Sequence, residues 1–311
     1  MVTKYIISHK SPDTDTICSS IIYSRYLKRK KNMNSVVCKL GELNNETKFV
    51  LEKFGFDVPK TCSELEMGSE IILMDHNEEK QSIDNRDKYK IIQIIDHHKM
   101  DFSTKEPLFI RAEPIGSTCS IVSKMFFEDK IELKQEEASL LISAIISDTL
   151  YFKSPTSTKE DVLLLEKLNK IAKIENMEKF ALEMFAKKSD LGDISIEKLV
   201  KMDYKEFNLN GNKIGVGVME TTMPDYGLNR KNEISQNLTK IIKNDGLDYA
   251  FLSIIDILNE KNYTIVANEK TANILKEIFK GEIEKENIVN LGRILSRKKQ
   301  IIPKLEEYFS N

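Results

Sequence analysis

The sequence lacks the cysteine pattern of a disulfide scaffold. Four cysteines occur in 311 residues, at positions 18, 38, 62 and 119, with no CxxC pair and no even spacing. Because disulfide frameworks show closely and regularly spaced cysteines, this pattern favours free thiols in a reducing compartment. Cys18 and Cys119 fall on apolar faces, with no setting for a catalytic thiol.

Long apolar runs and a strong net charge are also missing. The longest apolar stretches, such as LLISAII, are too short to span a bilayer, and Met1–Pro12 has no signal-peptide layout. Lysine and arginine total 47, against 49 aspartates and glutamates. That balance leaves no overall field for nucleic acid or an anionic membrane, so an anionic ligand needs local positive charge. We expect a cytoplasmic protein that binds neither nucleic acid nor membrane.

Histidine is scarce, and its distribution is uneven. The four histidines all lie in the first third of the chain, and each has an aspartate nearby: His9, His76, His97 and His98. Histidines with unrelated structural roles would be spread along the chain. The clustering therefore points to a shared site.

The first half alternates strand and helix patterns. Four short runs rich in isoleucine and valine predict buried strands: KYIIS (4–8), SVVCKL (35–40), EIILMD (70–75) and YKIIQIID (89–96). Helical spacing between them predicts an α/β fold with a doubly wound parallel sheet. Such sheets bind ligands at the carboxyl ends of their strands, and His9, Asp75 and Asp96–His98 fall at three of these ends.

The second half predicts a separate, smaller domain. Two helical patterns, near 158–172 and 175–188, are followed by a break with glycine and aspartate in KKSDLGDIS (187–195). A hairpin signal at Asn210–Gly211 and a second hairpin-like pair, FLSIIDIL and YTIVANE, then indicate a mixed sheet. We predict a catalytic metal-binding domain over 1–188, a linker over 189–194, and a smaller α/β domain over 195–311. The active site is expected in the cleft between the domains.

The segment HKSPDTD (9–15) has two interpretations. Asp13 or Asp15 fits as the N-cap of the following helix, because aspartate is favoured there. That accounts for one acid, but not for two acids beside His9. Carboxylates together with imidazole suit Mn²⁺, Co²⁺ or Zn²⁺. The segment alone does not decide between a cap and a metal site.

Three distant segments favour the metal. Asp75 ends a strand so apolar that its charge is costly without a cation. Asp96, His97 and His98 cluster after another apolar strand, and Asp148 closes a strongly apolar helical pattern. Two metals about 3.5–4 Å apart, sharing one carboxylate, are a common device for in-line attack at phosphorus. The candidate ligands are His9, Asp13, Asp15, Asp75, His97 and Asp148.

A weaker signal lies near the end of the chain, in SRKKQ (296–300). Three consecutive cations are framed by Ser296 and Gln300 and flanked by apolar residues. Arginine and lysine make the contacts that phosphate oxygens require. A solvated basic stretch at a helix start is the alternative. The turn EPIGSTCS (113–120) has a similar ambiguity, and we expect an ordinary turn and cap rather than an anion site.

With these segments in hand, the chain resembles the manganese-dependent (family II) inorganic pyrophosphatases of the DHH phosphoesterase superfamily. Its motifs follow the family order along essentially the whole chain: HKSPDTDTICSS, MDHNE, DHHK, SDTLYFKSPT, MDYKEF and SRKKQIIP. DHH enzymes that cut oligonucleotides or cyclic dinucleotides end in a domain with a Gly-Gly-rich motif. This sequence has no Gly-Gly pair.

The resemblance implies roles for individual residues. One metal would be held by His9, Asp13 and Asp75. The other would be held by Asp15, Asp75, His97 and Asp148, so that Asp75 bridges. His98 would contact the substrate and donate a proton. The second domain would grip phosphate through Lys205, Arg297 and Lys298. Asp96 and His76 would orient ligands rather than bind metal.

The resulting hypothesis is hydrolysis of inorganic diphosphate to two phosphates, in which a hydroxide that bridges two Mn²⁺ ions attacks phosphorus in line. Co²⁺ can replace Mn²⁺, and Mg²⁺ arrives with the substrate. The resemblance also implies a homodimer formed through the N-terminal domain. Two alternatives stay open: a DHH-type phosphodiesterase or exopolyphosphatase acting on short oligonucleotides or polyphosphate, and a catalytically silent metal-binding protein.

Overall fold

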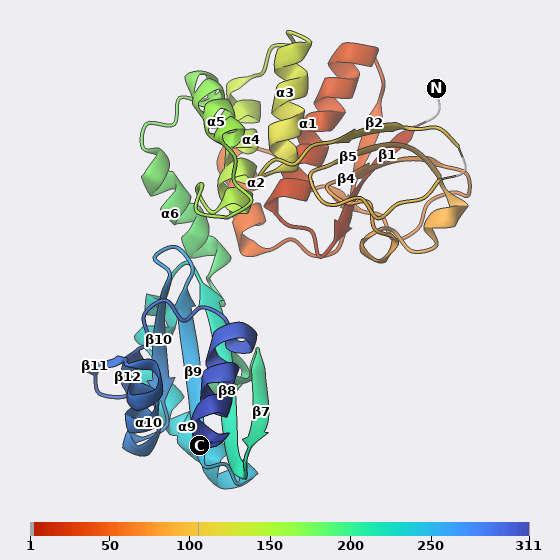
Figure 1. Ribbon diagram of the computed structural model, residues 1–311. Coiled ribbons are helices and arrows are strands. Elements are labelled where there is room, and N and C mark those ends of the chain that lie inside the picture. Colours follow the sequence, from red (N-terminus) through yellow and green to blue (C-terminus); the bar gives the residue numbers. More distant parts are fainter. Residues whose placement is uncertain (1–2, 105, 311) are drawn as a thin grey trace. The chain divides into compact units, whose positions relative to one another are not determined.

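The chain folds into two compact units, with the boundary between Lys188 and Ser189 (Figure 1). The structure is a computed structural model and describes residues 3–104 and 106–310. Among these residues, no helix is both long and apolar enough to cross a lipid bilayer. Each unit has its own six-stranded sheet.

The sheet of the first unit is parallel, in the order β3-β2-β1-β4-β5-β6. Its strands are β1 (Lys4–Lys10), β2 (Ser35–Leu40), β3 (Lys60–Thr61), β4 (Glu70–Met74), β5 (Lys90–Asp96) and β6 (Phe109–Ala112). The chain winds outward from β1 to β3, returns to β4 beside β1, and winds the other way to β6. This order confirms the predicted doubly wound sheet. It creates a switch point between β1 and β4, where such sheets bind ligands.

The helices of the first unit are α1 (Thr14–Lys31), α2 (Asn45–Phe54), α3 (Thr118–Glu128), α4 (Gln135–Thr149), α5 (Lys159–Ala172) and α6 (Met177–Lys188). Two 3₁₀ turns, Glu79–Gln81 and Arg86–Lys88, lie between β4 and β5. Helix α4 is buried at every position from Glu137 to Ser147, in agreement with its apolar sequence. Its carboxyl end carries Asp148.

Two of the four cysteines form a disulfide, so the prediction of free thiols is wrong for them. Cys38 in β2 bonds to Cys62, which follows β3 directly. The backbone N–H of Cys62 donates to the carbonyl of Lys39 at 3.2 Å, which continues the pairing of the two strands. Adjacent parallel strands bring the cysteines together across 24 residues, a proximity that sequence spacing does not reveal. Cys18 and Cys119 are free and buried.

The second unit has a mixed sheet in the order β11-β12-β10-β9-β8-β7, in which only the β8–β9 pair is parallel among the described residues. Its strands are β7 (Tyr204–Leu209), β8 (Asn212–Thr221), β9 (Tyr249–Asp256), β10 (Lys261–Val266), β11 (Glu282–Lys285) and β12 (Ile288–Asn290). Asn210 and Gly211 join β7 to β8 with φ angles of 51° and 88°. Both left-handed angles suit a tight hairpin turn, which confirms the predicted hairpin.

Helices cover both faces of the second sheet. They are α7 (Ile196–Lys201), α8 (Asp225–Leu228), α9 (Lys231–Asp245), α10 (Glu269–Phe279) and α11 (Ile302–Ser310), the last preceded by a π-helical turn, Arg297–Ile301. Leu252 packs in an apolar cluster with residues of α7 and α9. Its neighbour Phe251 belongs to a second cluster with α10 and α11. Successive side chains of a strand point to opposite faces of the sheet, so β9 contributes to both apolar clusters.

Candidate metal centre

Asp75 lies at the switch point of the parallel sheet. It follows β4 directly, its side chain is 2% exposed, and its backbone has a left-handed φ of 63°. That conformation is uncommon for a residue with a side chain and costs on the order of 1 kcal/mol or more. The Asp75 N–H donates to the carbonyl of Ile95 at 2.9 Å, so the neighbouring strand β5 holds the turn.

One group of side chains joins β1, the start of α1 and the end of β4. The Nε2 atom of His9 lies 3.5 Å from Oδ1 of Asp13 and 3.6 Å from Oδ2 of Asp75. His9 donates through Nδ1 to the carbonyl of Lys10 at 2.8 Å, which leaves Nε2 facing the two acids. One ligand atom from each of these residues fits within 4.8 Å of the others, close enough to share an ion.

Asp13 fulfils both interpretations of its segment. Its Oδ1 accepts a hydrogen bond from the N–H of Thr16 at 3.1 Å, so it is the N-cap of α1. The same oxygen faces His9. A carboxylate oxygen has more than one acceptor site, so capping and metal binding do not exclude each other.

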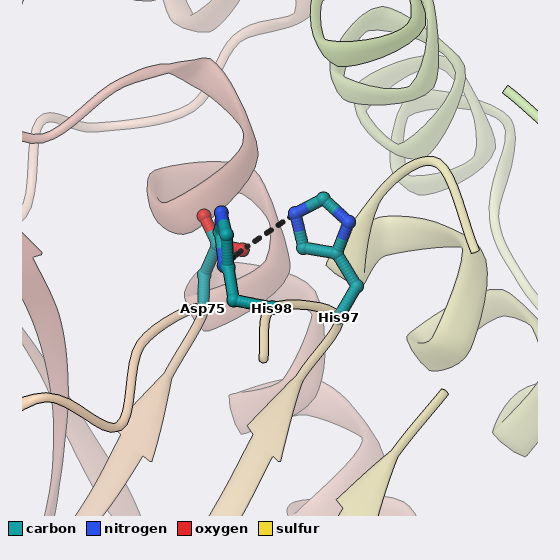
Figure 2. A group of neighbouring side chains, drawn as sticks. All are labelled: Asp75, His97 and His98. Atoms are coloured by element: carbon teal, nitrogen blue, oxygen red, sulfur yellow. Dashed lines mark ion pairs between the residues drawn. The ribbon is translucent and has the colours of Figure 1, made fainter. Parts of the chain in front are cut away.

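A second group joins the end of β5, the start of α1 and the end of α4. Ligand atoms of Asp15, His97 and Asp148 lie within 4.8 Å of one another. The Nε2 atom of His97 is 3.2 Å from Oδ2 of Asp148 and 3.5 Å from Oδ1 of Asp75, and Figure 2 shows the contact with Asp75. His97 donates through Nδ1 to the carbonyl of Ile115 at 2.8 Å.

Asp75 thus presents Oδ2 to the first group and Oδ1 to the second. Within the described residues, the Nε2 atom of His97 is buried without a hydrogen-bond partner. A lone pair aimed at carboxylates is unfavourable unless a proton or a cation lies between them. This orphaned atom and the mixed nitrogen and oxygen donors fit a divalent transition metal such as Mn²⁺.

Burial and the charge of a neighbouring acid raise the proton affinity of Asp75 and Asp148. Burial, and then the charge of Asp15, raises the pKa of Asp75 to about 7. The same two causes raise the pKa of Asp148 well above its usual range. Burial opposes the charged form of His9, but hydrogen bonds to Asp13 and Asp75 outweigh it and raise the pKa of His9 to about 11. Cations would relieve this crowding of negative charge.

The turn EPIGSTCS contributes more than the ordinary cap that its sequence predicts. It presents the N-terminus of α3 to Asp15, whose carboxylate accepts from the N–H groups of Thr118 at 2.6 Å and Cys119 at 3.0 Å. Ser117 donates to the same carboxylate at 2.7 Å. The turn therefore binds an anion, but one supplied by α1.

Thr118 is a site residue that the sequence reasoning missed. Its hydroxyl donates to Oδ1 of Asp75 at 2.7 Å, so α3 orients two acids at once. The signal in the sequence was a turn of small residues, several with hydroxyl groups, at the start of a helix. The hydrogen-bond partners of such hydroxyls cannot be assigned without the fold.

His98 and Asp96 form a pair beside this cluster. His98 donates through Nδ1 to Asp96 at 2.9 Å, and this bond is the main reason that the pKa of His98 rises to about 9. Asp96 is fully buried and also accepts from Asn77 at 2.6 Å. The His98 side chain is 54% exposed, so a cationic imidazole is held at the surface of the site.

His76 has a different environment from the other histidines. It is buried, and it donates through Nδ1 to the carbonyl of Met74 at 3.0 Å. Burial lowers the pKa of His76 to about 4, so the ring is neutral. Its ring lies edge-on to that of His9, with 6.4 Å between the centroids.

The three cations expected to bind phosphate all lie in the second unit. Lys205 on β7 and Lys298 in the π-helical turn are exposed. Arg297 is already paired, because its guanidinium donates to the Asp203 carboxylate at 2.6 Å and to the Asp203 carbonyl at 2.7 Å. It also donates to the carbonyl of Val216, the β8 partner of Lys205. Arg297 thus joins the segments MDYKEF and SRKKQ.

Gln300, the last residue of SRKKQ, stabilises the loop before the cationic turn. Its side-chain oxygen accepts from the N–H groups of Leu295 at 2.8 Å and Ser296 at 3.0 Å. Its amide nitrogen donates to the carbonyl of Arg293 at 3.2 Å. Gln300 therefore fixes the loop that leads into the cationic turn.

Comparisons with known proteins cover the whole chain. The DHH family, N-terminal domain, matches residues 3–145, and the DHHA2 domain matches residues 182–308. A probable manganese-dependent inorganic pyrophosphatase of Deinococcus radiodurans is 40% identical over 98% of both chains. A manganese-dependent inorganic pyrophosphatase of Methanocaldococcus jannaschii is 39% identical over 99% of both chains.

A solved structure agrees with these relatives. The crystal structure of a putative family II inorganic pyrophosphatase from Methanococcus jannaschii is 39% identical, covers 99% of this chain and 100% of its own, and superposes with a TM-score of 0.64. The chain belongs to the manganese-dependent (family II) inorganic pyrophosphatases, as its motifs predicted.

Proposed function

We propose that this chain hydrolyses inorganic diphosphate to two phosphates at a centre of two Mn²⁺ ions. The observation that carries the proposal is the shared carboxylate of Asp75, which faces His9 and Asp13 on one side and His97 on the other. Two metal positions with a common carboxylate suit in-line displacement at phosphorus. The relatives named as manganese-dependent inorganic pyrophosphatases, one of them as a probable one, are about 40% identical over nearly their full length.

The proposed ligands divide into two sets. One ion takes His9, Asp13 and Asp75. The other takes Asp15, Asp75, His97 and Asp148. When bound, the two ions supply Lewis-acid polarisation of phosphate oxygens and acidify water at neutral pH. Co²⁺ satisfies the same nitrogen and oxygen donors, whereas Mg²⁺ prefers phosphate oxygens and would arrive with the substrate.

The chain itself supplies cations and a proton. His98, held by Asp96 and protonated at neutral pH, donates a hydrogen bond or a proton to a phosphate oxygen as charge develops there. Lys205, Arg297 and Lys298 bind the phosphate groups, Arg297 by exchanging its bonds with Asp203 for bonds to the anion. We assign the catalytic metal site to residues 1–188, the connection to 189–194, and substrate binding to 195–311.

The activity is tested on metal-free protein preincubated with Mn²⁺, Co²⁺ or Mg²⁺. We expect the highest kcat/KM for diphosphate after preincubation with Mn²⁺ or Co²⁺, and little turnover of diphosphate with Mg²⁺ alone. We expect no hydrolysis of a dinucleotide. Faster hydrolysis of a dinucleotide or of short polyphosphate would favour the DHH phosphodiesterase or exopolyphosphatase alternative. No turnover of any of these substrates would favour a silent metal-binding protein.

We also propose that the chain forms a homodimer through the first unit. Strand β6 is the last strand of its sheet, and its Phe109 and Ile110 side chains are 47% and 43% exposed. An exposed apolar edge strand favours pairing with a second copy. Light scattering of wild type and of Ile110→Lys tests this, because the substitution should yield a monomer. A dimer that persists in the variant would exclude this edge.

We propose a cytoplasmic location because of the proposed substrate, diphosphate. Diphosphate is released by nucleotidyl-transfer reactions, which take place in that compartment. Cell fractionation with detection of the protein tests the proposal, and recovery outside the cytoplasmic fraction would refute it.

A further inference from the structure

Glu46 on α2 is a fully buried carboxylate outside the proposed ligand sets. Its Oε2 atom accepts from the Thr14 hydroxyl at 3.0 Å and from the Ser147 hydroxyl at 2.7 Å. Its Oε1 atom has no hydrogen-bond partner within the described residues. Burying a carboxylate with one oxygen that lacks a hydrogen bond costs free energy. The presence of Glu46 therefore needs a reason beyond packing.

Both hydroxyls that bond Glu46 lie next to proposed metal ligands. Thr14 stands between Asp13 and Asp15 at the start of α1, and Ser147 precedes Asp148 near the end of α4. A single oxygen of Glu46 therefore connects the two helix ends that carry three of the four proposed carboxylate ligands.

Lys188 supplies the opposing charge. Its ammonium lies 3.6 Å from Oε2 of Glu46 and donates to the Ser147 hydroxyl at 3.3 Å. Burial raises the pKa of Asp148, and the charge of Lys188 acts against that rise. The charge of Lys188 also contributes to the lowered pKa of Asp13, although His9 does more. The ammonium is thus within electrostatic range of ligands of both ions.

We propose that Glu46 is a positioning residue of the metal centre and that Lys188 and Glu46 balance each other's charge beside it. Glu46 sets the separation between the start of α1 and the end of α4, and with it the separation of Asp13 and Asp15 from Asp148. Its negative charge offsets Lys188, which would otherwise repel a divalent cation. This inference rests on the proposed function, because it presumes that the acids bind metal.

Glu137 provides a matched control. It is also a fully buried carboxylate in the first unit, but it lies at the opposite end of α4. It accepts two hydrogen bonds from Arg29, at 2.9 Å and 2.6 Å, and one from the N–H of Lys134. Ten residues separate it from Ser147, about 15 Å along the helix. Removing its charge should affect folding stability without reaching the metal centre.

The test is calorimetric titration of the metal-free full chain with Mn²⁺. Glu46→Gln should weaken Mn²⁺ binding about 10–100-fold, the usual range for a residue that orients metal ligands. Lys188→Met should tighten it, by roughly threefold to tenfold, because a nearby positive charge is removed. The double variant should return to within about threefold of wild type. Glu137→Gln should lower the unfolding temperature and leave the Mn²⁺ affinity unchanged.

Each outcome decides the proposal. Unchanged affinity in Lys188→Met, or a double variant that binds Mn²⁺ as weakly as Glu46→Gln, overturns the charge balance, and a Glu137→Gln loss equal to that of Glu46→Gln overturns the positioning role. If Glu46→Gln does not fold, Lys188→Met and Glu46→Asp carry the test, since the shorter acid keeps the charge but shifts its position. Failure of wild type to bind Mn²⁺ refutes the proposed function as well. Mn²⁺ binding by wild type, with unchanged affinity in Glu46→Gln and Lys188→Met, refutes this inference alone.

Discussion

The two units handle charge in opposite ways. In the first, Asp15 and Asp75 are buried at the switch point of a parallel sheet, close to other acids and to imidazoles. In the second, Lys205 and Lys298 project from an edge strand and a turn into solvent. Buried like charges are costly until a ligand compensates them, whereas solvated cations cost little. Changes to the buried acids of the site should therefore alter both stability and metal binding, whereas changes to Lys205 and Lys298 should alter only substrate binding.

A buried amide of the second unit, that of Asn262, sharpens this contrast. Asn262 is fully buried, yet its side chain donates to the carbonyl of Ile294 at 2.7 Å and accepts from Thr264 at 2.8 Å. These neutral groups satisfy one another and hold the loop before the cationic turn. In the first unit, by contrast, the Nε2 atom of His97 has no partner within the described residues. At the site, unlike around Asn262, a buried nitrogen without a hydrogen-bond partner faces carboxylates.

The largest effect is expected from Asp75→Asn. Loss of the shared carboxylate should reduce diphosphate hydrolysis by roughly 10⁴-fold, because groups that act as a unit fail together. Metal analysis after gel filtration should show loss of both ions. A variant that retains two Mn²⁺ would exclude Asp75 as the bridging ligand.

The pH dependence of the metal-free protein tests the buried acids. Asp75 has an ordinary pKa of 3.8 and a folded pKa of about 7, so the folded chain holds the proton more tightly. Stability should then fall as pH rises between these values, by up to about 4 kcal/mol from this group. Mn²⁺ should reverse the trend, because it binds the ionised form.

Urea unfolding at pH 5 and pH 8, without metal, measures this slope. Asp75→Asn should reduce it and should be more stable than wild type at pH 8. Equal stability of the metal-free wild type at both pH values would show that the cluster is not strained by its own charge.

The cations of the second unit should affect substrate binding alone. Lys298→Ala should raise the KM for diphosphate by about 10–100-fold, equivalent to about 1.5–3 kcal/mol for a hydrogen bond to a charged group. Its Mn²⁺ affinity should equal that of wild type. Lys299→Ala, an exposed neighbour with no assigned contact to phosphate, is the control. Weakened Mn²⁺ binding in Lys298→Ala would break the division between the units.

The smallest effect is expected from Thr118→Val. This change keeps the shape of the side chain but removes the hydrogen bond to Asp75. Loss of a hydrogen bond to a charged acceptor should weaken Mn²⁺ binding by about tenfold. Calorimetry detects this, and Thr156→Val, on an exposed loop, serves as the control. Unchanged affinity would mean that α3 supports Asp75 without orienting it.

Much of the first unit followed from sequence, for a physical reason. Apolar runs with sharp ends predicted β1, β2, β4 and β5, and parallel strands bring their carboxyl ends to one edge. His9, Asp75 and His97 therefore had to lie near one another. Predicting Asp148 as a site residue required one further observation, that a charged residue ends an apolar helix.

The remaining features depend on contacts across the fold. The bonds from α3 to Asp15 join residues more than a hundred positions apart. The Cys38–Cys62 disulfide depends on the edge strand β3, which has only two residues and no sequence pattern of its own. The pairing of Arg297 with Asp203 likewise reflects the meeting of β7 with the cationic turn. Residue types alone do not specify such partners.

The most direct test is the number of Mn²⁺ ions that the metal-free chain binds, measured by calorimetry and checked by metal analysis. Our account predicts two tightly bound ions per chain, both held by the first unit, with diphosphate hydrolysis appearing as the second ion binds. A single ion per chain at full activity, or activity without bound Mn²⁺ or Co²⁺, would contradict it.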